Sequence, residues 1–179
     1  MSKPTETLRA LTARGVTHVV GLPDSISGPL FDVVERHPAI RMVTVTREGE
    51  AFAIATGLWM GGAMPLVVIQ NTGLLESGDA LRGTALRMSA PIPVLVTGRG
   101  YTKMRAVGID PAEPLSRELL ARIDVDSAAL LTERTLDAWG IPRSSCEGDD
   151  DPAQAVYDAI GAAREGEHPV ALIVARSFT

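Results

Sequence analysis

The chain has 179 residues, 45% of them apolar and 22% charged, which is enough for one hydrophobic core. Its formal net charge of -5 and the lack of a Lys/Arg block argue against nucleic acid or an anionic membrane as a partner. Neither a secretory signal nor a run near the roughly 18 to 20 apolar residues of a membrane span is present, so we expect a soluble, cytoplasmic protein.

Predicted helices and strands alternate through the first third of the chain. Residues 6–15 have helical spacing, and 16–22 form a short β-branched run that reads as a strand. A second helix follows at 27–37 and a second strand at 40–46. A long helix made mostly of small and apolar residues is then predicted at 48–62.

The same alternation continues to the end of the chain. Strands are predicted at 65–71 and 91–98, with a helix at 78–89 between them. Residues from Arg99 to about Pro114 are rich in Gly, Pro and Arg and read as a loop. The remaining predicted elements are helices at 115–122, 127–138 and 152–164 and a strand at 168–176.

Strands that are apolar on both faces and alternate with helices are typical of parallel sheets. We therefore predict an α/β fold, a mostly parallel sheet of about six strands with helices on both faces, in a single domain over residues 1–179. In such folds ligands bind beyond the carboxyl ends of the strands. The segments that matter are then GLPDS (21–25), TREGE (46–50), QNTGL (70–74) and TGRGY (97–101).

The chain lacks the sequence signatures of several common kinds of enzyme. The chain has no phosphate-binding G-x-x-x-x-G-K-[ST] loop, no G-x-G-x-x-G after the first strand and no G-x-S-x-G nucleophile elbow. Its one cysteine, Cys146, reads as a structural or surface thiol, and the three histidines lack metal-ligand spacing. Asp149, Asp150 and Asp151 are consecutive, unlike the ligands of a calcium loop. We expect no metal ligands in this chain.

Four segments together resemble one enzyme family. GLPDS (21–25), REGEAFAIATG (47–57), VIQNTGL (68–74) and VLVTGRG (94–100) follow the order and spacing of the pyrimidine-binding domain of thiamine diphosphate enzymes. The resemblance is to the decarboxylase and acetolactate synthase group, and most of all to the alpha chains or domains of sulfopyruvate and phosphonopyruvate decarboxylases. In that family an acid at the end of a strand stands nine residues before a glycine; here Glu48 stands nine before Gly57, and Glu50 only seven.

The resemblance implies that Glu48 is the catalytic acid. Its carboxyl group would hydrogen-bond a pyrimidine nitrogen of thiamine diphosphate and so help the cofactor to deprotonate its own thiazolium carbon. Small neighbours such as Gly49 and Ala51 would desolvate the carboxyl group and admit a flat ring. An isolated pair of glutamates could instead simply favour a helix N-terminus. We expect Glu50 to face solvent or an interface.

The other three segments imply the remaining contacts. For the cofactor they point to the loop residues Gln70, Asn71, Thr72 and Gly73 in addition to Glu48. For a small anionic 2-keto acid they point to Asp24, Ser25 and Asn71. Arg99 is added because it forms a cluster of cations with Lys103 and Arg105 in an otherwise acidic chain, which favours an anionic substrate. The competing interpretations are a helix cap at GLPDS, a turn at Asn-Thr-Gly and solvated charges in the loop after residue 98.

Two segments depart from the sulfopyruvate and phosphonopyruvate pattern. The family usually continues its Gln-Asn loop with GLGN, whereas this chain has GLLESGDAL; and GIDPAEP replaces an acid-Pro-Gln-His element. Both departures lie where a substrate would be selected. Another 2-keto acid, or a carboligase of the acetolactate synthase type, is therefore an alternative to decarboxylation, and a non-catalytic scaffold or regulatory subunit is a third.

The family's diphosphate-binding motif, GDG followed by asparagines, is absent from the sequence. We therefore predict a two-chain 2-keto acid decarboxylase in which this chain is the alpha subunit. A separate beta subunit would hold the diphosphate through Mg2+, in an α2β2 or larger assembly. Phe52, Leu58, Trp59 and Met60 are candidates for an apolar surface at the subunit boundary, or for an ordinary buried core.

Overall fold

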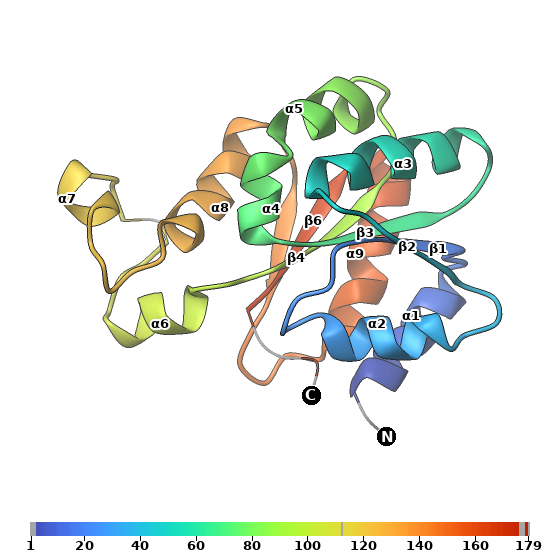
Figure 1. Cartoon of the computed structure of the whole chain (residues 1–179), viewed down its shortest axis with the longest axis horizontal. Helices are drawn as coiled ribbons and strands as arrows, with labels where there is room; N and C mark the ends of the chain where they lie inside the picture. The colour runs from blue at the N-terminus through green and yellow to red at the C-terminus, as the bar shows by residue number, and fades with distance from the viewer. Residues whose placement is uncertain (1–2, 112, 176–177, 179) are drawn as a thin grey trace.

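The computed structural model describes residues 3–111, 113–175 and 178. Six strands form one sheet in the order β2-β1-β3-β4-β6-β5, and every neighbouring pair is parallel (Figure 1). The strands are β1 His18–Gly21, β2 Arg41–Thr44, β3 Pro65–Gln70, β4 Pro93–Thr97, β5 Arg143–Cys146 and β6 Val170–Val174. The predicted α/β fold with a parallel sheet is confirmed.

Helices cover both faces of this sheet (Figure 1). One face carries α3 Glu48–Met60, α4 Asn71–Glu76, α5 Gly78–Leu81, the π-helix η1 Arg82–Leu86 and α8 Ser127–Ala138. The other carries α1 Lys3–Ala13, α2 Gly28–Glu35 and α9 Pro152–Gly166. The short helices α6 Tyr101–Ala106 and α7 Arg117–Leu120 extend away from the sheet beside α8 (left in Figure 1).

The central strands supply two separate cores because successive side chains point to opposite faces. In β3, Val67 and Ile69 pack with α3, α4 and α8, while Leu66 and Val68 pack with α1, α2 and α9. The edge strand β5 is mostly exposed, and the edge strand β2 is exposed at both ends and half-buried at Met42 and Val43. This arrangement explains why the central strands are apolar throughout and the edge strands are not.

The structure corrects several predicted elements. Strand β5 was not predicted, because its sequence RSSC is polar and lies at an edge of the sheet. The helices α4 and α6 occupy segments that the sequence predicts as loops, and the predicted helix 78–89 consists of α5 and η1. The predicted last strand ends at residue 174, and residue 176 lies outside the described residues.

The strand order brings the predicted ligand loops together. Strand β1 lies between β2 and β3. The chain therefore adds β2 on one side of β1 and then β3 on the other, and this reversal of strand order is where ligands bind in such sheets. Gly21, the last residue of β1, faces Val68 of β3 so closely that a Cβ atom there would lie 1.8 Å from the Val68 carbonyl oxygen. The loops after β1 and β3 therefore start side by side. Among the described residues, no helix is both long and apolar enough to span a membrane.

Candidate functional site

Glu48 is the first residue of α3, and it lies against the first turn of α4. A Cβ atom added to Gly73 would come within 2.3 Å of Glu48 Cγ and 2.4 Å of its Cδ. The Glu48 side chain is half-buried, and it forms no hydrogen bond or ion pair with any residue that the structure describes. The helix start thus presents a partly desolvated carboxyl group with unused acceptor capacity.

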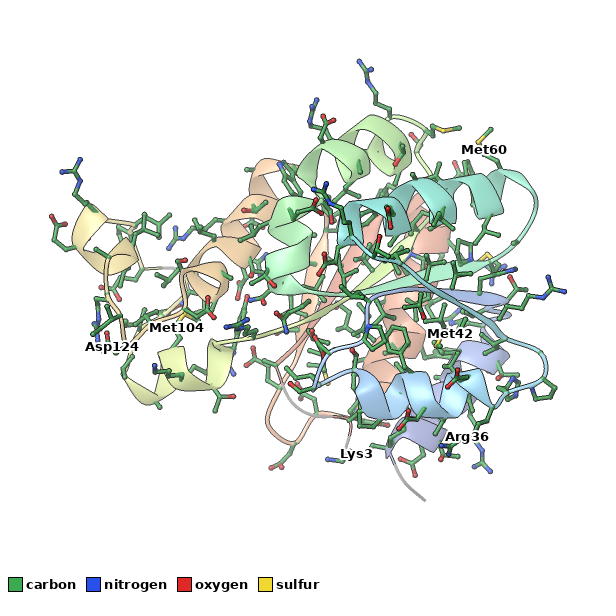
Figure 2. All side chains as sticks on the ribbon, in the orientation of Figure 1. Lys3, Arg36, Met42, Met60, Met104 and Asp124 are labelled. Atoms are coloured by element: carbon green, nitrogen blue, oxygen red, sulfur yellow. The ribbon has the colours of Figure 1, made fainter. Side chains whose placement is uncertain are left out.

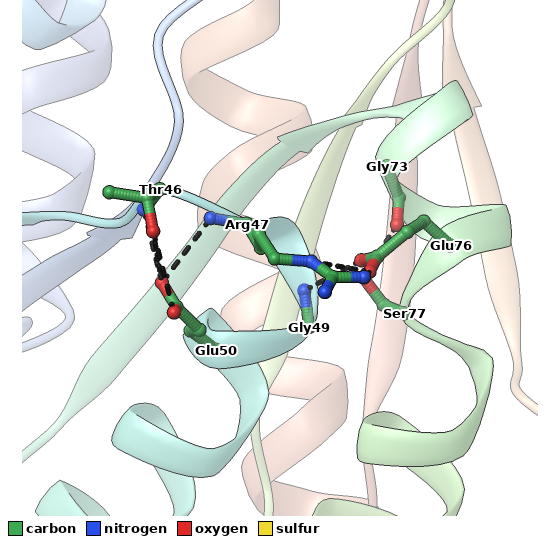
Figure 3. Close-up of polar contacts among 7 residues, drawn as sticks. All are labelled: Thr46, Arg47, Gly49, Glu50, Gly73, Glu76 and Ser77. Atoms are coloured by element: carbon green, nitrogen blue, oxygen red, sulfur yellow. Dashed lines mark hydrogen bonds and ion pairs between the residues drawn. The ribbon is translucent and has the colours of Figure 1, made fainter.

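The start of α3 is fixed to α4 by Glu76 (Figure 3). The Arg47 guanidinium lies 2.5 Å from Glu76 Oε1, and the Gly49 amide donates to Glu76 Oε2 at 3.1 Å. At the end of α4, the hydroxyl of the C-cap residue Ser77 donates to the Gly73 carbonyl at 2.5 Å. Glu48 therefore sits between two residues that are both held by Glu76.

Glu50 has a separate role at the same helix end (Figure 3). Its carboxylate accepts from the Thr46 and Arg47 backbone amides at 3.1 and 3.2 Å and from the Thr46 hydroxyl. The hydrogen bonds from these amides lower the pKa of Glu50 below its ordinary value. The interpretation that the two glutamates favour a helix N-terminus therefore applies to the exposed Glu50, whose carboxylate accepts from backbone amides. It does not apply to Glu48, whose carboxyl group accepts from no backbone amide of the described residues.

Asp24 links the loops that follow three neighbouring strands. Its Oδ1 accepts from the Ile26 and Ser27 amides at 2.8 and 2.7 Å. Its Oδ2 accepts from Gln70 Nε2 at 3.3 Å and from the buried Thr97 hydroxyl. The Asp24 carboxylate thus stabilises the turn before α2 and joins β1 to β3 and β4. It does not cap the helix as the helix-cap interpretation expects, because the N-cap of α2 is Ser27, which makes no side-chain capping hydrogen bond.

The predicted cofactor residues Gln70, Asn71 and Thr72 lie together at the end of β3. Gln70 Oε1 accepts from the Thr72 hydroxyl at 2.8 Å, while the buried Asn71 donates through Nδ2 to the Arg99 carbonyl at 2.9 Å. Asn71 Oδ1 accepts from the Thr72 amide at 3.1 Å. Both polar atoms of Asn71 are thus engaged within the chain, whereas the exposed Thr72 side chain faces outward.

Ser25, Gln70 and Arg99 border a cleft of about 930 Å³ at the carboxyl ends of the strands. Its opposite wall comes from α6 and the start of α8, and includes Lys103 and Asp126. Arg99 is 61% exposed, and its Nε lies 3.2 Å from Asp126 Oδ2. The structure therefore brings Ser25 and Arg99 to one cleft, but it pairs Arg99 with a carboxylate.

The expected apolar surface on α3 is only partly correct. Phe52 is fully buried and belongs to the core, and Leu58 and Trp59 are partly buried against that core. Met60 is 65% exposed, at the far end of α3 from Glu48 (Figure 2). Ile54, which the sequence interpretation missed, is 36% exposed.

Three supporting residues were also missed: Thr97, Glu76 and Asp126. Each contacts a site residue that is 27 to 73 positions away along the chain. Glu76 lies in the segment GLLESGDAL, which departs from the family's GLGN pattern. That departure is the one feature of the sequence that singles out Glu76. Within the described residues, no cluster of three or more His, Cys, Asp or Glu side chains is suited to a metal ion, and Cys146 is buried.

Known proteins share both sequence and fold with this chain. A phosphonopyruvate decarboxylase of Streptomyces viridochromogenes is 42% identical over 90 residues, covering 50% of this chain and 23% of the relative. The sulfopyruvate decarboxylase subunit alpha of Methanococcus maripaludis is 24% identical over 166 residues, covering 93% of this chain and 90% of the relative. This chain thus spans about a quarter of the length of the phosphonopyruvate decarboxylases that it matches.

Solved structures agree on the fold. Benzoylformate decarboxylase from Polynucleobacter necessarius superposes with a TM-score of 0.68 at 19% identity, covering 97% of this chain and 30% of that chain. The family described as "Thiamine pyrophosphate enzyme, N-terminal TPP binding domain" matches residues 5–114. With more than half of its length matched, this chain belongs to the thiamine pyrophosphate enzyme family, as an N-terminal TPP-binding domain.

Proposed function

We propose that this chain is the alpha subunit of a two-chain, thiamine diphosphate-dependent 2-keto acid decarboxylase of the sulfopyruvate or phosphonopyruvate type. Residues 1–179 would form its single pyrimidine-binding domain. The observation that carries the proposal is the half-buried Glu48 carboxyl group, which has no partner among the described residues and is held beside Gly73. The names of the relatives support the reaction class.

The residues around Glu48 fit a flat heterocycle with ring nitrogens. Gly73 leaves room for the Glu48 side chain, and the hydroxyl oxygen of the neighbouring Thr72 can accept a further hydrogen bond. When bound, thiamine diphosphate supplies the electron sink that lets a 2-keto acid lose carbon dioxide. Glu48 would hold a proton between its carboxylate oxygen and a pyrimidine nitrogen, in a place where partial burial strengthens that hydrogen bond.

The cleft beside Gln70 is the proposed substrate side of the site. Ser25 contributes a hydroxyl group there, and it stands on a loop that Asp24 fixes to β3 and β4. Because Asn71 uses both polar atoms of its side chain within the chain, we assign it the role of joining the start of α4, which carries Thr72, to the Arg99 carbonyl after β4.

The beta subunit remains part of the proposal. Relatives that cover much of this chain are named subunit alpha, which supports a second chain, and that chain would hold the diphosphate and Mg2+. One face of α3 exposes the small or apolar residues Ala53, Ile54, Gly57 and Met60 at helical spacing. Such a face favours contact with another chain over contact with water. An α2β2 assembly would give two sites, and a larger assembly would give more.

The test is a Glu48→Gln substitution in the assembled enzyme. We expect carbon dioxide release from sulfopyruvate or phosphonopyruvate to fall roughly 100-fold or more, because a neutral amide cannot exchange the proton. Cofactor binding, measured by calorimetry, should weaken but persist. The matched control is Glu50→Gln, two residues away, which should leave the rate constant unchanged. Full activity of Glu48→Gln would contradict the proposal.

The same mixture separates the alternatives. Consumption of two 2-keto acids to form one larger product would indicate carboligation. Failure of the assembled chains to bind thiamine diphosphate would favour a scaffold.

A further inference from the structure

The segment after β4 carries three cations, and two of them are paired. Arg99 lies 3.2 Å from Asp126, and Arg105 pairs with Glu147. Lys103, which lines the cleft of about 930 Å³, forms no ion pair with a residue that the structure describes. Lys103 is therefore the member of this trio whose charge is not matched by a carboxylate in direct contact.

Asp124 interacts electrostatically with Lys103, but it already forms an ion pair with Arg122. Asp124 lies on the loop between α7 and α8 (Figure 2), 2.5 Å from the Arg122 guanidinium. This contact holds the pKa of Asp124 at about 2, and Lys103 adds a smaller contribution. Because Asp124 is paired with Arg122 and Asp126 with Arg99, Lys103 is the cation without a carboxylate in direct contact among the described residues that line the cleft.

Hydroxyl groups stand around the same cleft. Ser25 comes from the loop after β1, Thr102 from α6 and Ser127 from the first turn of α8. None of these three hydroxyls hydrogen-bonds to a residue in the described part of the chain, so each is available as a donor. An ammonium group and three hydroxyl donors that line one cleft suit a tetrahedral oxyanion, which offers three oxygens, better than a flat carboxylate.

We propose that Lys103, together with the hydroxyls of Ser25, Thr102 and Ser127, binds the tetrahedral anionic group of the substrate. That group is a sulfonate or a phosphonate. This inference rests on the proposed function and deepens it by assigning substrate selection to α6 and α8. Arg99, held by Asp126, supports the wall of the cleft and is not the anion's ligand, which replaces the expectation from sequence that Arg99 binds the substrate.

Lys103 can be observed individually by NMR, because Lys3 and Lys103 are the two lysines of the chain. Reductive methylation with 13C-formaldehyde keeps the charge and labels Lys3, Lys103 and the N-terminal amine. In the chain of 179 residues, titration with sulfoacetate or phosphonoacetate should shift the Lys103 signal saturably. The Lys3 signal and an acetate titration serve as controls. Lys103→Gln assigns the signal. The anion that shifts the Lys103 signal at the lower concentration indicates whether the site prefers a sulfonate or a phosphonate. If neither anion gives a saturable shift, the proposal is wrong.

Kinetics of the assembled enzyme provide the second measurement. Lys103→Gln should raise KM about tenfold or more with little change in kcat, Lys103→Arg should restore most of the loss, and Lys3→Gln, the same change in α1 away from the cleft, should leave KM unchanged. A KM that rises in Arg99→Ala and not in Lys103→Gln overturns the assignment. If Lys103 binds the anions but the assembly releases no carbon dioxide, the proposed function fails while the subsite stands. If the assembly releases carbon dioxide and its KM does not depend on Lys103, the proposed function stands and the subsite fails.

Discussion

At the scale of single residues, Gly73 and Glu48 share one small space. Gly73 lies in α4 with an ordinary helical backbone, so alanine there should favour the helix by about 1 kcal/mol. The new Cβ would, however, overlap Glu48 Cγ and Cδ, and the flexible glutamate side chain is the part that has to move. We predict that Gly73→Ala keeps or raises the melting temperature while it lowers the proposed activity about 100-fold.

Thermal unfolding and steady-state kinetics on the same preparation check this prediction. Gly83→Ala is the matched control, because a Cβ there meets no atom within 4 Å. It should change neither the activity nor the fold. Unchanged activity in Gly73→Ala would mean that the position of the Glu48 carboxyl group does not matter for the reaction.

At the scale of elements, the start of α3 depends on the charge of Glu50. The Thr46 and Arg47 amides donate hydrogen bonds to its carboxylate and lower its pKa. The ionised carboxylate therefore stabilises the folded state at pH values above the pKa of 4.5 that Glu50 has in the unfolded chain. This stabilisation is lost as the pH falls through the folded pKa. We predict that Glu50→Gln lowers the melting temperature at pH 7 and that the difference disappears in acid. Thermal unfolding at a series of pH values measures it, and a difference independent of pH would contradict the assigned cause.

The same elements explain which parts of the fold the sequence could predict. The central strands and α3 were predictable because both cores require apolar residues in them. Strand β5 was not, since at an exposed edge of the sheet RSSC needs no apolar pattern. Helix α4 was hidden because Asn-Thr-Gly also favours a turn.

Prediction of the site divides in a similar way. Glu48 and the loops around Gln70 and Ser25 follow from local motifs, and the sheet topology then brings the two loops together. The pairing of Arg47 with Glu76, and of Arg99 with Asp126, joins residues more than 25 positions apart. Since no local spacing encodes such a pair, sequence alone could not show that Arg99 is already neutralised.

At the scale of the whole molecule, the exposed face of α3 should decide assembly. Ile54 and Met60 lie on this face, and a lysine at either position would remain in water in the free chain, so its free energy of unfolding should change by no more than about 0.5 kcal/mol. In the assembly the same ammonium group would be buried without a partner, and its desolvation should prevent binding of the beta subunit. Size-exclusion chromatography with light scattering checks the mixture of the two chains. Ala13→Lys, at an exposed position of α1 on the opposite face of the sheet, is the control. Assembly by the Ile54→Lys and Met60→Lys variants at the wild-type affinity would exclude this face as the subunit boundary.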